Sequence, residues 1–176
     1  MTLPIPAGTY GIDAMHTQLG FSVTHLGISI IRGTFDRFTG SLTVGATLQD
    51  TSVTLEAEMA SVNSGNTMRD QHIHGADFFD VENHPTLAFS AAAVNEIAGG
   101  YELHGQLTLK GITQPIVLAT TYNGSNVFPM DQSTHYGFSA TGTISRSAFA
   151  MGYGVPMVSD DVKLTLEAQF ISPASA

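Results

Sequence analysis

The sequence predicts an all-β protein, a small antiparallel barrel of eight strands with one short helix near residues 66–75. Apolar and polar residues alternate with a period of two along most of the 176 residues, as expected when one face of each strand is buried. Charged residues make up only 12%, about half of the usual share, and Gly, Ser and Thr are abundant. Closing eight strands into a barrel removes the two unpaired edges of an open sheet.

The N-terminal part of the chain predicts two strands, from Tyr10 to His25 and from Ile31 to Val44. Apolar residues recur at alternate positions of both segments. A third strand follows from the alternation between Val53 and Met59, where Thr and Glu occupy the intervening positions.

The stretch from residue 63 to residue 80 breaks this rhythm and predicts the short helix. Ser64 or Asn66 can cap its N-terminus, and the helix is expected to end near Gly75. The following turn carries Phe78 and Phe79.

Five further strands are predicted around residues 87–91, 101–109, 116–122, 136–144 and 162–170. Turn dipeptides lie between several of them, at Gly99-Gly100, Lys110-Gly111 and Asn123-Gly124. No linker or internal repeat interrupts the series, so a single domain is expected over residues 1–176.

The pattern leaves the interior open to two interpretations. An eight-stranded barrel is either filled by its own side chains or holds one ligand, and a two-sheet sandwich would show the same alternation. Several positions expected to point inward are small, which favours a hollow barrel, although large neighbours could fill the space: Ala57, Ala91, Gly105, Ala140, Gly142 and Ala168.

Composition excludes several classes of function. Fifteen acidic and six basic residues give a net charge of −9, so no nucleic-acid partner is expected. The absence of cysteine excludes disulfides and thiolate chemistry. No apolar run is long enough to span a bilayer. The N-terminus has no signal-peptide pattern, so the chain as written is expected in the cytoplasm, or in the periplasm or outside the cell if a leader was removed.

Motifs along the chain form an ordered set that covers nearly its whole length. They are Tyr10, Asp13, His16, Phe21, Val23, His25 and Gly27; Gly33, Phe35, Phe38 and Gly40; Arg69-Asp70; Asp77-Phe78-Phe79-Asp80; His84-Pro85 and Phe89; residues 105–113; Ile144, Ser145, Arg146, Phe149 and Gly152; and Val158-Ser159-Asp160. This set resembles the YceI-like family of polyisoprenoid-binding proteins. The sequence departs from the family pattern at Ile73 and His74, and at Ala150, close to a usual glycine.

The resemblance implies a lipocalin-like barrel, commonly a homodimer, that binds a long isoprenoid or fatty amphiphile such as an isoprenoid quinone. It therefore implies binding, transport or storage of a lipid without catalysis, and no cofactor other than the bound lipid. A dry apolar tube suits such a ligand, because each buried methylene stabilises the complex by about 0.8 kcal/mol.

Strand parity and the resemblance together select sixteen candidate ligand-binding residues. Twelve are apolar and are expected to line the tube: Phe21, Val23, Ile30, Phe35, Phe38, Met59, Met68, Leu87, Phe89, Leu107, Phe138 and Phe149. Four are polar and are expected near an entrance: His25, Arg69, Asp70 and Arg146. For Arg69, pairing with a nearby carboxylate is favoured over contact with a lipid head group.

Two alternatives remain at this point. Seven histidines could support a metal-dependent enzyme or redox protein if three of them met at one point, although no recognised metal spacing is present and no metal ligand is assigned. A barrel with a solid core could instead serve as an interaction module. Motifs for a nucleophilic serine, a phosphate loop or a dinucleotide site are missing, so no catalytic residue is assigned.

Overall fold

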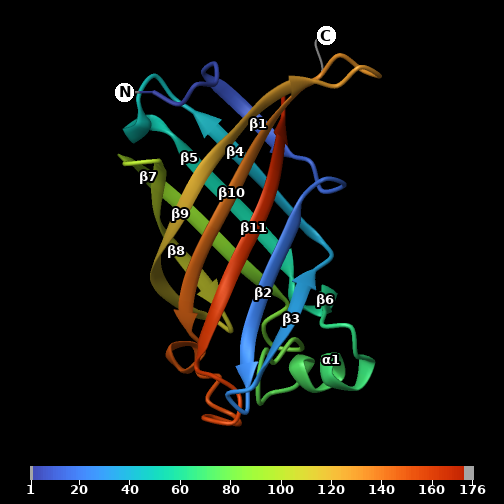
Figure 1. Cartoon of the computed structure of the whole chain (residues 1–176). Coiled ribbons are helices and arrows are strands. Elements are labelled where there is room, and N and C mark those ends of the chain that lie inside the picture. Colours follow the sequence, from blue (N-terminus) through green and yellow to red (C-terminus); the bar gives the residue numbers. More distant parts are fainter. Residues whose placement is uncertain (1, 173–176) are drawn as a thin grey trace.

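The computed structural model describes residues 2–172 and consists almost entirely of strands (Figure 1). The helix α1 spans Thr67–His74, and short 3-10 turns occur at Leu48–Asp50, Met59–Ser61 and Arg146–Phe149. The strands are β1 (Gly8–Ile12), β2 (Gln18–His25), β3 (Ser29–Phe35), β4 (Phe38–Val44), β5 (Ser52–Glu58), β6 (Val62–Asn63), β7 (Thr86–Ile97), β8 (Gly100–Leu109), β9 (Ile112–Val127), β10 (Thr134–Ser145) and β11 (Asp161–Ile171).

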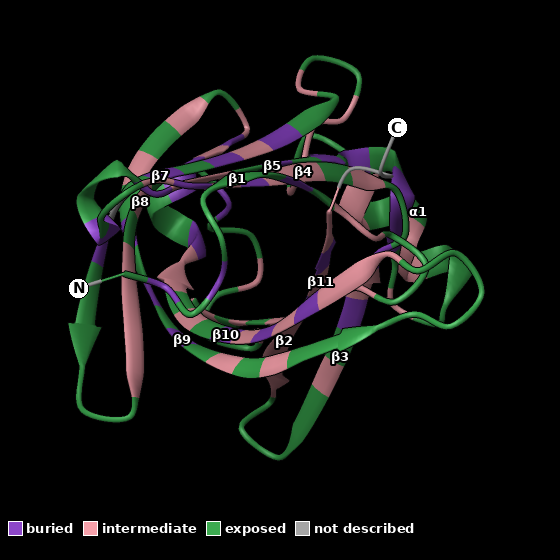
Figure 2. Ribbon diagram, turned by 90° about the horizontal axis from the view of Figure 1, so that it is seen from above, coloured by how far each residue is buried: buried purple, intermediate pink, exposed green. Residues whose placement is uncertain are grey.

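Eight of these strands close into an antiparallel barrel in the order β1-β4-β5-β7-β8-β9-β10-β11. Closure occurs where β1 pairs with β11, with Gly11 opposite Ile171 and Ile12 opposite Phe170. Strands β2, β3 and β6 extend this sheet from the other half of β11. The prediction of a closed eight-stranded barrel is confirmed, and the sandwich is excluded because the described strands form one continuous sheet (Figure 2).

Both predicted N-terminal strands are divided in the structure. The segment between β1 and β2 turns at Asp13, whose carboxylate accepts hydrogen bonds from the Met15 backbone (3.0 Å) and the His16 ring. The next pair divides at Asp36 and Arg37, between β3 and β4. Each half then pairs with a different neighbour: β1 with β4, and β2 with β3.

The predicted turns at Gly99-Gly100 and Lys110-Gly111 join β7 to β8 and β8 to β9. The turn predicted at Asn123-Gly124 is wrong, because β9 continues through both residues. Gly124 pairs with Gly137 and Tyr122 with Phe138, so Asn123 is the extra residue of a β-bulge. The positive φ of Gly124 (114°) shows that the backbone freedom of glycine serves the bulge instead of a turn.

The predicted helix is confirmed with Asn66 as its N-cap. The Asn66 side chain accepts a hydrogen bond of 3.0 Å from the Arg69 backbone N–H, as expected for a capping asparagine. The helix is followed by Gly75 and lies beside one end of the barrel (Figure 1).

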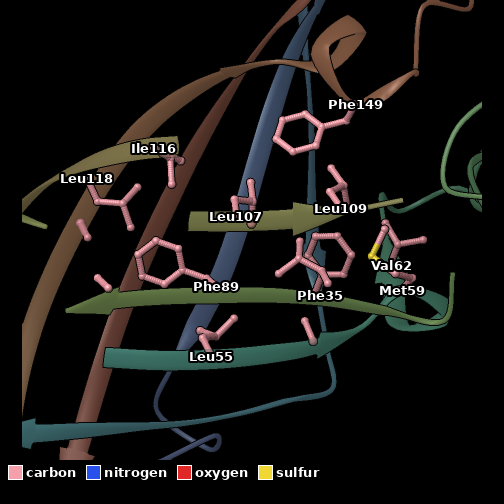
Figure 3. Close-up of a cluster of buried hydrophobic side chains, with 14 of the residues drawn as sticks. Phe35, Leu55, Met59, Val62, Phe89, Leu107, Leu109, Ile116, Leu118 and Phe149 are labelled. Atoms are coloured by element: carbon pink, nitrogen blue, oxygen red, sulfur yellow. The ribbon is translucent and has the colours of Figure 1, made fainter. Parts of the chain in front are cut away.

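Two clusters of buried side chains occupy the barrel. The termini-side cluster lies toward the end that carries the chain termini and includes Leu3, Ile5, Tyr10, Leu42, Val44, Leu48, Val94, Tyr136, Phe138, Ala168 and Phe170. The helix-side cluster lies toward α1 and includes Phe35, Leu55, Met59, Phe89, Leu107, Leu118 and Phe149 (Figure 3). The N-terminal segment helps to fill the first end, and the Tyr10 hydroxyl donates to the Pro6 carbonyl (2.6 Å).

Candidate functional site

The helix-side half of the barrel contains a cavity of about 460 Å³. This volume lies within the range of roughly 300–1,000 Å³ that is typical of small-molecule sites. Phe170 belongs both to the cavity wall and to the termini-side cluster, so the cavity begins where that cluster ends. At the other end, the wall includes residues of α1 and of the segments 75–80 and 151–158, which form its mouth.

Strand register places the apolar wall. Leu55 on β5 pairs with Phe89 on β7, and Phe89 pairs with Leu107 on β8. Figure 3 shows these three side chains pointing into the same interior, together with Leu118 from β9. Alternation along each strand keeps intervening side chains, such as that of Glu56 beside Leu55, on the outer face.

Polar side chains are concentrated at the mouth. His25, Ser64, Arg69, His72 and Arg146 all contribute to the cavity wall there. The Arg69 guanidinium donates to the Ser64 hydroxyl (2.7 Å) and to the Ser64 carbonyl (2.6 Å). The Asp70 carboxylate accepts from the Ser64 hydroxyl and from its backbone N–H (2.9 Å). The predicted pairing of Arg69 with a carboxylate is replaced by this shared attachment to Ser64.

Arg146 organises the loop on the opposite side of the mouth. Its side chain is buried, and it donates to the backbone carbonyls of Met151, Tyr153, Val158 and Ser159. Burial lowers the pKa of the Arg146 guanidinium from its ordinary value, and the nearby Asp160 carboxylate opposes this shift. The residue therefore fixes the 151–159 segment against the end of β10.

Aromatic rings connect the two sides of the mouth. His72, Phe78 and Tyr153 meet edge to face, with ring centroids 5.1–5.6 Å apart. The Arg146 guanidinium lies 5.9 Å from the centre of the Phe78 ring. Phe79 stacks on Phe35 at 5.8 Å and so covers the strand wall beneath α1. The segment 75–80 thus joins the helix, the loop and the barrel at one place.

Nine of the sixteen residues selected from the sequence lie in the cavity wall. The apolar members come from β2, β3, β7 and β8, and the polar members lie at the mouth: Phe21, Val23, Phe35, Leu87, Phe89, Leu107, His25, Arg69 and Arg146. Their convergence depends on barrel closure, because they belong to segments that are distant along the chain.

Four apolar candidates do not line the cavity because they lie on another face or in the other half of the barrel. Ile30 has the parity opposite to Phe35 and is exposed on β3. Met68 lies on the outer side of α1 and is 81% exposed. Phe38 follows the break between β3 and β4 and packs against the helix-side cluster from its edge. Phe138 points inward but belongs to the termini-side cluster.

Three further candidates are held in packed or hydrogen-bonded positions outside the cavity. Met59 is completely buried beside Val62 in the solid part of the helix-side cluster (Figure 3). Phe149 is packed in the same cluster at the end of a 3-10 turn. Asp70 is directed to Ser64.

The selection missed cavity residues of two kinds. Leu103, Ile116, Leu118, Leu164 and Leu166 lie on strands whose alternation was visible, so parity would have found them. The other group lies in the irregular segments at the mouth, which carry no periodic signal: Phe78, Phe79, Met151, Tyr153, Met157 and Val158.

Five histidines lie near carboxylates, and two of them share one. His16 lies 2.6 Å and His135 3.6 Å from the Asp13 carboxylate, while His72, His84 and His104 contact Asp77, Asp80 and Glu102. Burial favours a higher pKa for Asp13, but hydrogen bonds from His16 and the Met15 N–H, with the two imidazoles nearby, hold the pKa below its ordinary value. Within residues 2–172, no three His, Asp or Glu side chains are grouped as metal ligands would be.

Comparison with known proteins agrees with this architecture. The family model described as YceI-like domain matches residues 10–170. A UPF0312 protein of Staphylococcus aureus is 31% identical over 171 residues, covering 92% of this chain and 96% of that protein. A UPF0312 protein of Ectopseudomonas mendocina is 32% identical over 169 residues, covering 94% and 88%.

Solved structures show the same fold. BcnA of Burkholderia cenocepacia superposes with a TM-score of 0.78 at 21% identity, covering 92% of this chain and 99% of that one. The YCEI protein of Campylobacter jejuni has a TM-score of 0.75 at 28% identity, covering 85% and 90%. A polyisoprenoid binding domain from Saccharophagus degradans, implicated in plant cell wall breakdown, has a TM-score of 0.68 at 15% identity, covering 93% and 98%. None of the described helices is long and apolar enough to cross a membrane.

Proposed function

Because this chain belongs to the YceI-like family, we propose that it binds a long-chain amphiphilic lipid inside its barrel, a polyisoprenoid or an isoprenoid quinone. In this proposal the protein carries or stores the lipid without changing it chemically. The observation that carries the proposal is the apolar cavity of about 460 Å³ in the helix-side half of the barrel.

The size of the cavity favours a long chain over a short one. A water-sized group takes about 30 Å³ in a liquid, so on the order of fifteen such groups fit. At about 0.8 kcal/mol per buried methylene, filling the cavity contributes roughly 12 kcal/mol. Association itself costs roughly 4–15 kcal/mol. A short chain would leave most of this stabilisation unused, so only a ligand that fills the cavity is bound well.

The distribution of polar groups favours one orientation of the lipid. The inner end of the cavity is lined by Val53, Leu103 and Phe170, whereas His25, Arg69 and Arg146 lie at the mouth. A hydrocarbon tail suits the inner end, and a head group that accepts hydrogen bonds suits the mouth. Quinone carbonyls and phosphates are both acceptors for arginine and histidine.

One structural neighbour is named a polyisoprenoid binding domain, but at 15% identity it supports the shared fold alone. The choice of a long apolar chain therefore depends on the cavity, and the choice of an isoprenoid depends on membership of the YceI-like family. A solid-core interaction module is disfavoured by the same cavity, which the side chains of the barrel leave unfilled.

The proposal is tested by extracting purified protein with organic solvent and analysing the extract by mass spectrometry. We expect a long-chain isoprenoid lipid in stoichiometric amount after mild purification. The delipidated protein should then rebind farnesol, a linear prenol with about the fifteen chain carbons that fit the cavity, in preference to a prenol of a single isoprene unit. Equal affinity for short and long prenols, or affinity for neither, would overturn the proposal.

A further inference from the structure

We propose that the mouth of the barrel docks on the surface of a lipid bilayer, an inference that rests on the proposed function. The docking surface, called here the mouth rim, combines the β2–β3 hairpin with the 151–158 loop. Six large apolar side chains of the rim are exposed: Leu26 (54%), Ile28 (85%), Ile30 (53%), Tyr153 (53%), Val155 (44%) and Met157 (59%).

Backbone contacts hold the two segments of the rim together. The Leu26 N–H donates to the Met157 carbonyl (2.6 Å), and the Ser159 N–H donates to the Thr24 carbonyl (2.8 Å). His25 and Val158 form an isolated β-bridge between them. Figure 1 shows both segments at the lower tip of the barrel, where the β2–β3 hairpin meets the loop that precedes β11.

The hairpin turn directs an apolar side chain outward. Leu26 and Gly27 both have positive φ (53° and 69°), and the Ile28 N–H donates to the His25 carbonyl (3.1 Å). This tight turn leaves Ile28 as the most exposed side chain of the rim. Isolated apolar residues are common on protein surfaces, but six gathered around one opening indicate a binding surface.

The rim is continuous with the cavity. Tyr153 and Met157 are exposed on the rim and also belong to the cavity wall. Their neighbours Val23 and Val158 line the wall just inside. If a lipid tail left a bilayer through water, each methylene that became exposed would raise its free energy. A mouth seated on the bilayer gives the tail an apolar path into the barrel.

The charge of these segments favours a lipid surface. The chain has fifteen acidic residues, yet none lies in residues 18–35 or 151–158, which make up the rim. Arg32 is the one charged residue of those two segments at neutral pH. Carboxylates would be repelled by lipid phosphates and are costly to bring against an apolar phase. A second copy of the chain seated on the rim would cover the mouth and block exchange of the ligand, which favours the bilayer as the partner.

The proposal is tested by sedimentation of the full chain with phosphatidylcholine vesicles, which carry no net charge and so do not repel a chain with a net charge of −9. Ile28→Glu changes the tip of the rim without touching the cavity wall. Met130→Glu is the matched control, because Met130 is equally exposed (86%) on the β9–β10 loop at the opposite end of the barrel. We expect the vesicle partition constant to fall about tenfold or more for Ile28→Glu, since burial of one isoleucine is worth about a factor of ten, and to stay unchanged for Met130→Glu.

The results that overturn docking are separable from failure of the proposed function. Farnesol binding without vesicles reports the cavity alone, and Ile28→Glu should retain it with an unchanged melting temperature. If wild-type protein binds farnesol but does not sediment with vesicles, docking is wrong and the lipid-binding proposal survives. Equal sedimentation of both variants also overturns docking. So does a wild-type dimer that Ile28→Glu converts to a monomer, since the rim would then be an interface between two copies.

Discussion

Ala140→Leu is the sharpest test of the hollow barrel. Ala140 is a buried residue of β10 and belongs to the cavity wall. It pairs with Leu166 on β11 and Thr120 on β9, so its direction is fixed by two neighbouring strands. Leucine at this position adds three carbon atoms inside the cavity without altering the strand ladder.

The expected loss of affinity follows from the volume that the ligand loses. Three displaced methylene equivalents at about 0.8 kcal/mol each weaken binding by roughly 2.4 kcal/mol. With about 1.4 kcal/mol for each factor of ten, the dissociation constant for farnesol rises about fiftyfold. In the protein without ligand, the same atoms fill empty space, so the free energy of unfolding should stay constant or increase.

The assay combines farnesol displacement of a fluorescent fatty acid with urea unfolding of the delipidated protein. Ala119→Leu is the matched control, because Ala119 is exposed on the outer face of β9 opposite Thr141. The control should change neither quantity. An unchanged affinity for Ala140→Leu, together with a loss of more than about 1 kcal/mol in unfolding free energy, would show an overpacked solid core and refute the reasoning.

Three further predictions concern the frame around the cavity. Arg146→Met removes the donors of four backbone carbonyls in residues 151–159, so urea unfolding should show a loss of about 3 kcal/mol or more, and a loss below about 1 kcal/mol would contradict this role. Because the folded pKa of Asp13 lies below the ordinary value of 3.8, its carboxylate stabilises the fold above that pH and the contribution disappears as pH falls through the folded pKa. Asp13→Asn should therefore destabilise the protein near neutral pH, and its difference from wild type in unfolding free energy should shrink below about pH 4; a difference independent of pH would count against it. Asn66→Ala should cost about 1 kcal/mol in thermal unfolding through loss of the helix cap to the Arg69 N–H, whereas Asn66→Asp should retain most of the stability.

Most of the barrel could be predicted because strand alternation is a local signal. Each of the eight predicted segments forms one or two strands, and the helix begins at the predicted cap Asn66. Closure was favoured because an open sheet leaves two edges unpaired, but the same alternation left a two-sheet sandwich open until the strand pairing was known. The division at Asp13 was not predicted, because its turn depends on side-chain bonds to Met15 and His16 that leave no periodic signal.

The candidate site was less predictable, because parity fixes the face of a strand but not the half of the barrel that a residue occupies. Phe89 and Phe138 both point inward, yet Phe89 lines the cavity and Phe138 fills the opposite end. The residues at the mouth of the cavity were even less predictable from the sequence. Tyr153 and Met157 lie in an irregular loop whose position is set by hydrogen bonds from Arg146 to backbone carbonyls. No sequence pattern predicts these hydrogen bonds.

Gly105 and Gly142, two of the small inward residues that first pointed to the cavity, do not create it. A Cβ atom added at Gly105 would lie 2.6 Å from the Phe89 ring, and one added at Gly142 would lie 2.6 Å from a Leu118 methyl carbon. Larger neighbours have therefore taken the space above both glycines, as in a solid core. The two halves of the barrel differ because the N-terminal segment packs into only one of them. Leu3 and Ile5 are buried against the termini-side cluster, whereas α1 lies beside the other end with no buried residue among its described positions. The helix-side half keeps its cavity because, within residues 2–172, α1 lies beside that end without filling it.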